Sequence, residues 1–279
     1  MKESSFNDWE KGIFSAVKQI GAPNNTDTVR WYLHDRPPDN DLEFDDGSGI
    51  TYVWNKHGFR SDEFVNDGRD SIMVLGCSFA VGLGVKIEDT WASQLRDKIN
   101  PDLKVYNLGI SATSGDYIVR ALHKTIDELK PIAVFVMWPG YGSREILIRK
   151  RIITFRIGGP SSAVHVDKFF ANYTDVFTDP SYFMYQQNKN VEMAKAICDS
   201  RGIGFFDLSV IPKDNIPFDD PNNLVARLKN FSHTDPDSVK VFGSEHKFAP
   251  ARDGLHFGKE WNGYIASVFH QKYSNQRRH

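Results

Sequence analysis

Hydrophobic positions gather into four short runs that are nearly free of polar residues, and segments with helical periodicity separate these runs. Continuous apolar runs of this length are typical of strands buried on both faces of a parallel sheet. The runs are SIMVLG (71–76), KVYNLGIS (104–111), IAVFVMW (132–138) and IGFFDLS (203–209). The helical segments are TWASQLRDKI (90–99), DYIVRALHKTIDELK (116–130), YFMYQQNKNVEMAKAICDSRG (182–202) and EWNGYIASVFHQKY (260–273). This alternation predicts an α/β fold, a three-layer α/β/α sandwich with a central parallel sheet.

The first 70 residues follow a different pattern, and we expect them to form an N-terminal extension packed on a core domain of residues 71–279. Hydrophobic residues with helical spacing over 6–21 are followed by an acidic, turn-rich stretch and then by a strand-like ITYVWN (50–55). Within the core domain, residues 143–180 and 212–250 follow neither the spacing of a helix nor the pattern of a strand for long. We expect both to be irregular insertions whose aromatic side chains form a wall of the substrate site.

Composition and charge narrow the classes of function. Hydrophobic residues make up 40% of the 279 residues and charged residues 25%, which suits a globular protein with a substantial core. The net charge of -2 gives no overall attraction to nucleic acid or to anionic lipid. The chain shows neither a secretory signal nor a run of ~20 apolar residues, so we expect a cytoplasmic protein without membrane partners. Its two cysteines, Cys77 and Cys198, form no disulfide framework and no metal-binding pattern.

Residues with catalytic potential stand directly after the predicted strands, where open parallel sheets bind their ligands. Ser78 follows the first apolar run and Gly109 lies in the second, while Asp253 and His256 precede the last helix. A serine hydroxyl needs a base before it can attack, and His256 could be that base. Asp253 could hold the imidazole in the correct tautomer. The backbone N–H groups of Ser78 and Gly109 could bind the oxyanion of an acyl-transfer intermediate.

Simpler interpretations of the same residues stay open at this point. Ser78 suits the N-cap of a helix, and so does Asp253 before the last helix. Cys77 is a second candidate nucleophile, although neighbouring side chains of an extended chain point to opposite sides. No histidine stands in a zinc-binding pattern, and DNDLEFDDG (39–47) lacks the central glycine and the closing glutamate of a calcium loop, so we predict no metal and no organic cofactor. Arg60 is interpreted as a structural ion-pairing residue.

Three short blocks, in chain order, resemble the SGNH (GDSL-type) hydrolases. Gly76-Cys77-Ser78-Phe79 is similar to the first block of that family, NLGISATSGD with Gly109 to the second, and DGLH, ending at His256, to the last. The segment NKHGFRSDEF (55–64) resembles one that precedes the core in SGNH proteins of phages and in polysaccharide-acetylation proteins. The resemblance implies a flavodoxin-like sheet, a polysaccharide-modifying branch of phage origin, and a Ser78–Asp253–His256 triad that needs no cofactor.

The chain departs from this family at two places. Cys77 replaces an aspartate that takes no part in the chemistry, and the third block, Gly-x-Asn-Asp, is missing from MWPGYGSRE (137–145). The asparagine side chain of that block would be an oxyanion donor. The possible substitutes are the Ser143 hydroxyl, the Trp138 indole N–H, the Arg144 guanidinium and the backbone N–H of Gly140 or Tyr141.

The predicted function is hydrolysis of a carboxylic ester by a serine mechanism. The substrate would be a short-acyl ester of a small molecule or of a glycan, such as a sugar O-acetyl group, because aromatic side chains suit sugar rings. Two other functions stay open. An O-acyltransferase would use a sugar hydroxyl in place of water, and an inert binding or structural module would explain the missing third block.

Overall fold

The computed structural model has a central sheet of four parallel strands in the order β4-β3-β5-β8. The strands are β3 (Ser71–Gly76), β4 (Lys104–Asn107), β5 (Ala133–Trp138) and β8 (Gly204–Ser209). The structure describes residues 43–45, 50–55, 57–65, 67–111, 113–139, 143–148, 151–156, 180–209, 228–229, 240–241, 251 and 256–277. All four strands predicted from the apolar runs are therefore confirmed, although β4 ends at Asn107, before the second run does.

The order of the strands singles out the carboxyl end of β3. This first strand of the sheet pairs with β4 on one side and with β5 on the other, and β8 follows beyond β5. The chain thus passes from β3 to β4 on one side, and then crosses back over β3 to form β5 and β8 on the other side. A reversal of this kind opens a crevice beyond the strand ends, and the order is that of flavodoxin-like sheets. The fold class predicted from the sequence is confirmed.

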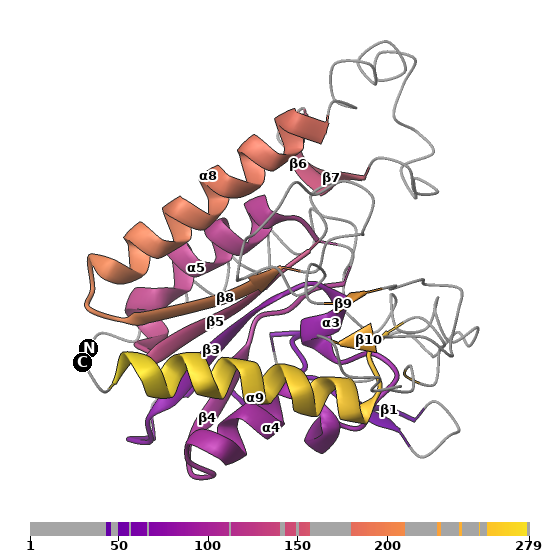
Figure 1. The fold of residues 1–279 in the computed structure, drawn as a ribbon, viewed down its shortest axis with the longest axis vertical. Coiled ribbons are helices and arrows are strands. Elements are labelled where there is room, and N and C mark those ends of the chain that lie inside the picture. The colour runs from indigo at the N-terminus through magenta and orange to yellow at the C-terminus, as the bar shows by residue number, and fades with distance from the viewer. Residues whose placement is uncertain are drawn as a thin grey trace.

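Two pairs of helices cover the two faces of the sheet, as Figure 1 shows. One pair is α4 (Trp91–Ile99) and α9 (Lys259–Gln276), and the other is α5 (Gly115–Leu129) and α8 (Pro180–Asp199). Alternate residues of β3 point to opposite layers. Ile72 and Val74 belong to the apolar cluster with α4 and α9, whereas Met73 and Leu75 belong to the cluster with α5 and α8. Every residue of β3 is buried, which explains why its sequence lacks the alternation of a half-exposed strand.

The expectation that residues 143–180 are irregular was wrong for their first part. Strands β6 (Ser143–Ile148) and β7 (Arg151–Arg156) form an antiparallel hairpin directly after β5. Their sequence, SREILIRKRIITFR, holds five β-branched residues but also several charges, so no continuous apolar run marked it. In the second predicted insertion the structure describes the short strands β9 (Leu228–Lys229) and β10 (Lys240–Val241), which pair with each other.

Described residues of the predicted N-terminal extension pack against the segment that follows β3. Strand β1 (Glu43–Asp45) pairs with β2 (Thr51–Val53), and Tyr52 and Trp54 form an apolar cluster with Val81 and Leu83. The helix expected over residues 6–21 lies outside the described residues. A domain boundary near residue 70 stays a prediction.

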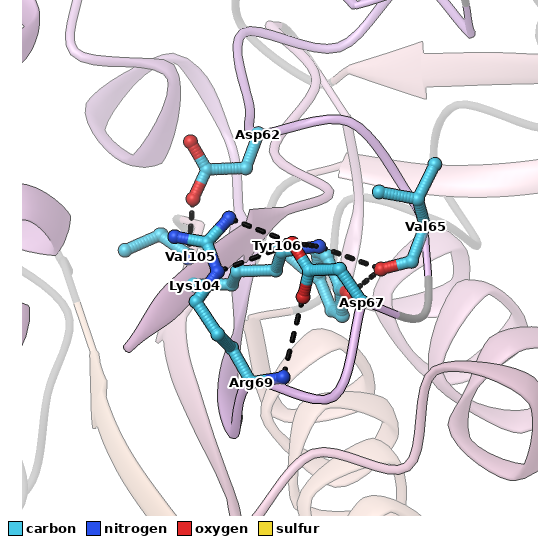
Figure 2. Close-up of polar contacts among 7 residues, drawn as sticks. All are labelled: Asp62, Val65, Asp67, Arg69, Lys104, Val105 and Tyr106. Atoms are coloured by element: carbon cyan, nitrogen blue, oxygen red, sulfur yellow. Dashed lines mark hydrogen bonds and ion pairs between the residues drawn. The ribbon is translucent and has the colours of Figure 1, made fainter. Parts of the chain in front are cut away.

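A polar cluster, drawn in Figure 2, lies at the amino end of β4. The Lys104 ammonium is 2.8 Å from an Asp67 carboxylate oxygen and donates a hydrogen bond to the Val65 carbonyl. Arg69 also pairs with Asp67. Hydrogen bonds from Arg69 and then Lys104 hold the pKa of the Asp67 carboxyl well below its usual range. Because this cluster lies at the amino end of β4, it joins loops together on the side of the sheet away from Ser78.

Two short helices complete the segment between β3 and β4. Helix α3 (Ser78–Val81) begins immediately after the strand, and the 3-10 helix η1 (Ile87–Asp89) leads into α4. Thr90 caps α4, since its side chain accepts a hydrogen bond from the Ser93 N–H. Ser114 caps α5 in the same way through the Tyr117 N–H. These caps explain why both helices begin at their observed positions.

Candidate active site

The structure brings Ser78 and His256 together at the carboxyl end of β3. The Ser78 hydroxyl oxygen lies 2.8 Å from Nε2 of His256, although 178 positions separate the two residues in sequence. Ser78 is the first residue of α3, and its predecessor Cys77 is the extended residue that caps this helix. His256 lies just before α9. The distance is that of a hydrogen bond through which a serine proton can pass to an imidazole.

An aromatic ring packs beside the imidazole, which has little contact with solvent. The ring centroids of Phe79 and His256 are 5.0 Å apart. Phe257 packs on the Phe79 ring, with their centroids 4.4 Å apart. His256 is 4% exposed and Ser78 is 8% exposed. The His256 carbonyl also accepts a hydrogen bond of 2.7 Å from the Ala251 N–H. Backbone and ring contacts together therefore hold the imidazole beside the serine.

The turn that carries His256 is attached to the neighbouring helix α4 by Asn262. The Asn262 amide donates to the carbonyls of Phe257 and Gly258, and its oxygen accepts from the Trp91 N–H at 2.9 Å. Asn262 is 2% exposed, so these hydrogen bonds form in a buried environment. They connect the beginning of α9 to the beginning of α4. The position of His256 thus depends on contacts from a part of the chain more than a hundred residues away.

The orienting role predicted for Asp253 falls outside the described residues. Cys77, the alternative nucleophile, is buried, and its carbonyl accepts hydrogen bonds from the N–H groups of Ala80 and Val81. The described hydrogen bond of the His256 ring goes to Ser78. This contact favours Ser78 over Cys77 as the nucleophile.

Gly109 lies against α3, but its N–H is already engaged. It donates to the Asn107 side-chain oxygen at 2.9 Å, while the Asn107 amide donates to the Ala80 carbonyl at 2.7 Å. A Cβ at position 109 would stand 3.0 Å from the Ala80 Cβ and 3.1 Å from the Val81 nitrogen. The close approach of two backbones therefore explains the glycine. The predicted oxyanion role of Gly109 competes with this bond, whereas the Ser78 N–H, in the first helical position, has no acceptor within its own helix.

Two of the substitutes predicted for the missing asparagine are engaged elsewhere, which corrects those predictions. The Trp138 indole N–H donates to the Asp207 carboxylate at 2.9 Å, and the Trp138 side chain is buried in the cluster with α5 and α8. The Arg144 guanidinium lies 3.0 Å from an Asp116 carboxylate oxygen and donates to Gln186. Both donors therefore already have acceptors within the protein. Ser143 begins β6, and its side chain, like Gly140 and Tyr141, lies outside the described residues.

Arg60 binds the backbone close to the candidate site, and the sequence did not reveal these contacts. Its guanidinium donates to the carbonyls of Val81, Gly82 and Val85, and its carbon stands 4.3 Å from the centre of the Tyr52 ring. Arg60 is 2% exposed. The residue interpreted as an ion-pairing partner therefore binds the backbone that follows Ser78. The motif GFR (58–60) drew attention to Arg60, but the sequence could not predict that its guanidinium binds backbone carbonyls.

The described residues show neither a metal-binding cluster nor a membrane-spanning helix. No group of three or more His, Cys, Asp or Glu side chains in that part of the chain could hold a metal ion. None of the described helices is both long enough and apolar enough to cross a membrane.

Comparison with known proteins gives structural similarities only. No protein-family model and no curated protein sequence matches the chain. Among solved structures, the chain is similar to the psychrotrophic esterase EstA from Pseudoalteromonas sp., with 15% identity, a TM-score of 0.40, and coverage of 74% of this chain and 99% of that one. It is also similar to Est24, a carbohydrate acetylesterase from Sinorhizobium meliloti, with 11% identity, a TM-score of 0.32, and coverage of 75% and 100%. A lipase/acylhydrolase from Enterococcus faecalis has 12% identity and a TM-score of 0.33 over 74% and 96%. Values this low assign no function, which has to be inferred from the chain's own residues.

Proposed function

We propose that this protein is a serine-dependent carboxylic ester hydrolase of the SGNH type, acting on a short-acyl ester. The observation that supports the proposal best is the 2.8 Å contact between the Ser78 hydroxyl and Nε2 of His256. It occurs at the carboxyl end of β3, where the winding direction of the sheet reverses and α/β proteins bind their ligands. Cys77, not Ser78, occupies the cap position of α3, so capping does not account for the Ser78 side chain, which points to an imidazole.

The proposed reaction begins when His256 accepts the Ser78 proton at Nε2. The Ser78 oxygen then forms a bond to the acyl carbon, and the electron pair of the carbonyl moves onto its oxygen. The Ser78 N–H would stabilise this oxyanion. Collapse of the intermediate breaks the bond to the alcohol, which takes the proton from His256. A water molecule, deprotonated by the same imidazole, then releases the acid and restores Ser78.

Asp253 is proposed to accept a hydrogen bond from Nδ1 of His256. Its place three residues before His256 supports this role, because a carboxylate there would fix the tautomer in which Nε2 is free to accept a proton. The imidazolium formed during the reaction would also gain a nearby negative charge. An amide at this position would keep the size of the side chain but lose that charge.

The substrate class rests on the surroundings of the two side chains. Phe79 stands against His256, Phe257 packs on Phe79, and both Ser78 and His256 are nearly buried, so a small acyl group is expected to fit best. We propose an acetyl group as that acyl group and a glycan hydroxyl as the alcohol. Aromatic residues in the segments between β7 and α8 would contact the sugar rings.

The proposal is tested by labelling the full-length protein with a fluorophosphonate probe and by measuring p-nitrophenyl acetate, butyrate and octanoate hydrolysis. We expect labelling and turnover in the wild type, loss of both in Ser78→Ala, and the highest kcat/KM with acetate. The matched control is Cys77→Ala, which should keep the label because it removes the neighbouring nucleophile only. Labelling that survives in Ser78→Ala, or a wild type without turnover on any ester, would refute the proposed function.

A further inference from the structure

Two buried hydroxyl groups in the loop after β4 have no hydrogen-bond partner among the described residues. They are Ser111 Oγ and Thr113 Oγ1, on residues that are 5% and 3% exposed. A buried hydroxyl without a partner loses its hydrogen bonds to water and gains nothing in return. Groups of this kind are rare in folded proteins and call for an explanation, such as a role in binding or catalysis.

Backbone hydrogen bonds place the residues just before Ser111 beside the end of β3. The Leu108 N–H donates to the Val74 carbonyl, and the Ile110 N–H donates to the Gly76 carbonyl at 3.1 Å. The chain therefore continues beside β3 after β4 ends, up to the level of the last residue of that strand. Ser78 lies two positions beyond Gly76, and Ser111 follows Ile110 directly. The two serines thus follow neighbouring backbone segments at the carboxyl end of the sheet.

The contacts of the residues just before Ser111 also place this loop beside α3. Leu108 and Ile110 belong to the apolar cluster with α5 and α8. The position between them, Gly109, faces the other way, since a Cβ there would touch Ala80 of α3. Ser111 stands in the turn that follows, directly after Ile110. Its buried, unpartnered hydroxyl therefore lies in the loop next to the start of α3.

We propose that the Ser111 hydroxyl is an oxyanion donor, which takes the place of the asparagine side chain that MWPGYGSRE does not offer. This inference rests on the proposed function. When Ser78 attacks the ester carbon, the carbonyl electron pair moves to the oxygen, and the Ser111 O–H donates a hydrogen bond to it without transferring its proton. The Ser111 hydroxyl has no partner among the described residues, and the substrate carbonyl oxygen would supply its acceptor. The Trp138 and Arg144 donors, by contrast, are already engaged.

The test compares Ser111→Ala with Thr113→Val in the full-length protein. Thr113→Val removes the other unpartnered hydroxyl of the same loop and keeps the shape of the side chain. We expect Ser111→Ala to lower kcat for p-nitrophenyl acetate by about 10²–10³-fold with little change in KM, which is the usual effect of losing one oxyanion donor. Thr113→Val should stay within about 3-fold of the wild type, a difference well below one lost donor.

A second measurement separates a donor from a residue that merely supports the loop. A phosphonate inhibitor, once bound to Ser78, places a negatively charged oxygen where the oxyanion forms, so its rate of inactivation should fall in parallel with kcat. An undiminished kcat in Ser111→Ala, or equal losses in both variants, would overturn the inference while Ser78-dependent turnover of the wild type keeps the proposed function intact. Wild-type turnover that persists in Ser78→Ala would overturn both.

Discussion

Replacing Arg60 by methionine should destabilise the protein and disturb the segment that follows Ser78. Methionine keeps much of the aliphatic volume but removes every donor. The Arg60 guanidinium donates to the Val85 carbonyl at 3.0 Å, to the Gly82 carbonyl at a shorter distance, and to the Val81 carbonyl at 3.3 Å. Counting only the two shorter contacts, at about 1.5–3 kcal/mol for each hydrogen bond to a charged group, gives a loss of about 3–6 kcal/mol. That is a large part of the 5–15 kcal/mol by which folded domains are typically stable.

The loss can be measured by urea unfolding followed by tryptophan fluorescence, with Arg96→Met as the control. Arg96 pairs with its neighbour Asp97 at the surface, so its replacement should cost no more than about 1 kcal/mol. Arg60→Lys keeps the charge but cannot reach three carbonyls at once, and it should fall between the two. In that variant kcat should drop more than KM rises, because the backbone that Arg60 binds leads directly from the nucleophile. A free energy of unfolding for Arg60→Met within about 1 kcal/mol of Arg96→Met would show that the three contacts do not stabilise the fold.

Three further predictions follow from other contacts. The pKa of the Asp67 carboxyl is lowered in the folded state, so its stabilising contribution is present above the unfolded pKa of about 3.9 and is lost as the pH falls toward the folded value. The urea midpoint of the wild type should therefore drop more between pH 7 and pH 3 than that of Asp67→Asn, and equal drops would contradict the assignment. Gly109→Ala should displace α3, because the added Cβ would stand 3.0 Å from the Ala80 Cβ, and should cost about 1–3 kcal/mol in thermal or urea unfolding together with a lower kcat; wild-type stability and kcat would show that the loop can yield freely. Burial raises the pKa of the Cys198 thiol to about 12, so in a Cys77→Ser background this thiol should resist iodoacetamide until urea unfolds the protein, and rapid labelling of the native state would be inconsistent with it.

Much of the sheet could be predicted from the chain because its strands are buried on both faces. The run SIMVLG contains no residue that must reach solvent, and burial of six consecutive residues is typical of a central strand in a parallel sheet. The hairpin of β6 and β7 escaped prediction because its charged residues find partners in the fold. Arg144 pairs with Asp116 of α5, and Glu145 pairs with Arg120 of the same helix. Side chains that pair across the structure leave no periodic signal in the sequence.

For the candidate site, too, the sequence determined some features and the tertiary structure determined others. The sequence alone determined the fold class, the choice of Ser78 and His256 as candidates, and the end of the sheet at which to look, because strand runs and short blocks are local patterns. Only the tertiary structure decided that these two side chains meet, that the donors of Trp138 and Arg144 are engaged elsewhere, and that the Gly109 N–H serves a turn. The physical reason is that a hydrogen bond requires two atoms far apart in the chain to be placed at the right distance to within a few tenths of an ångström. Those distances are set by how helices pack on the sheet, and no residue pattern records them.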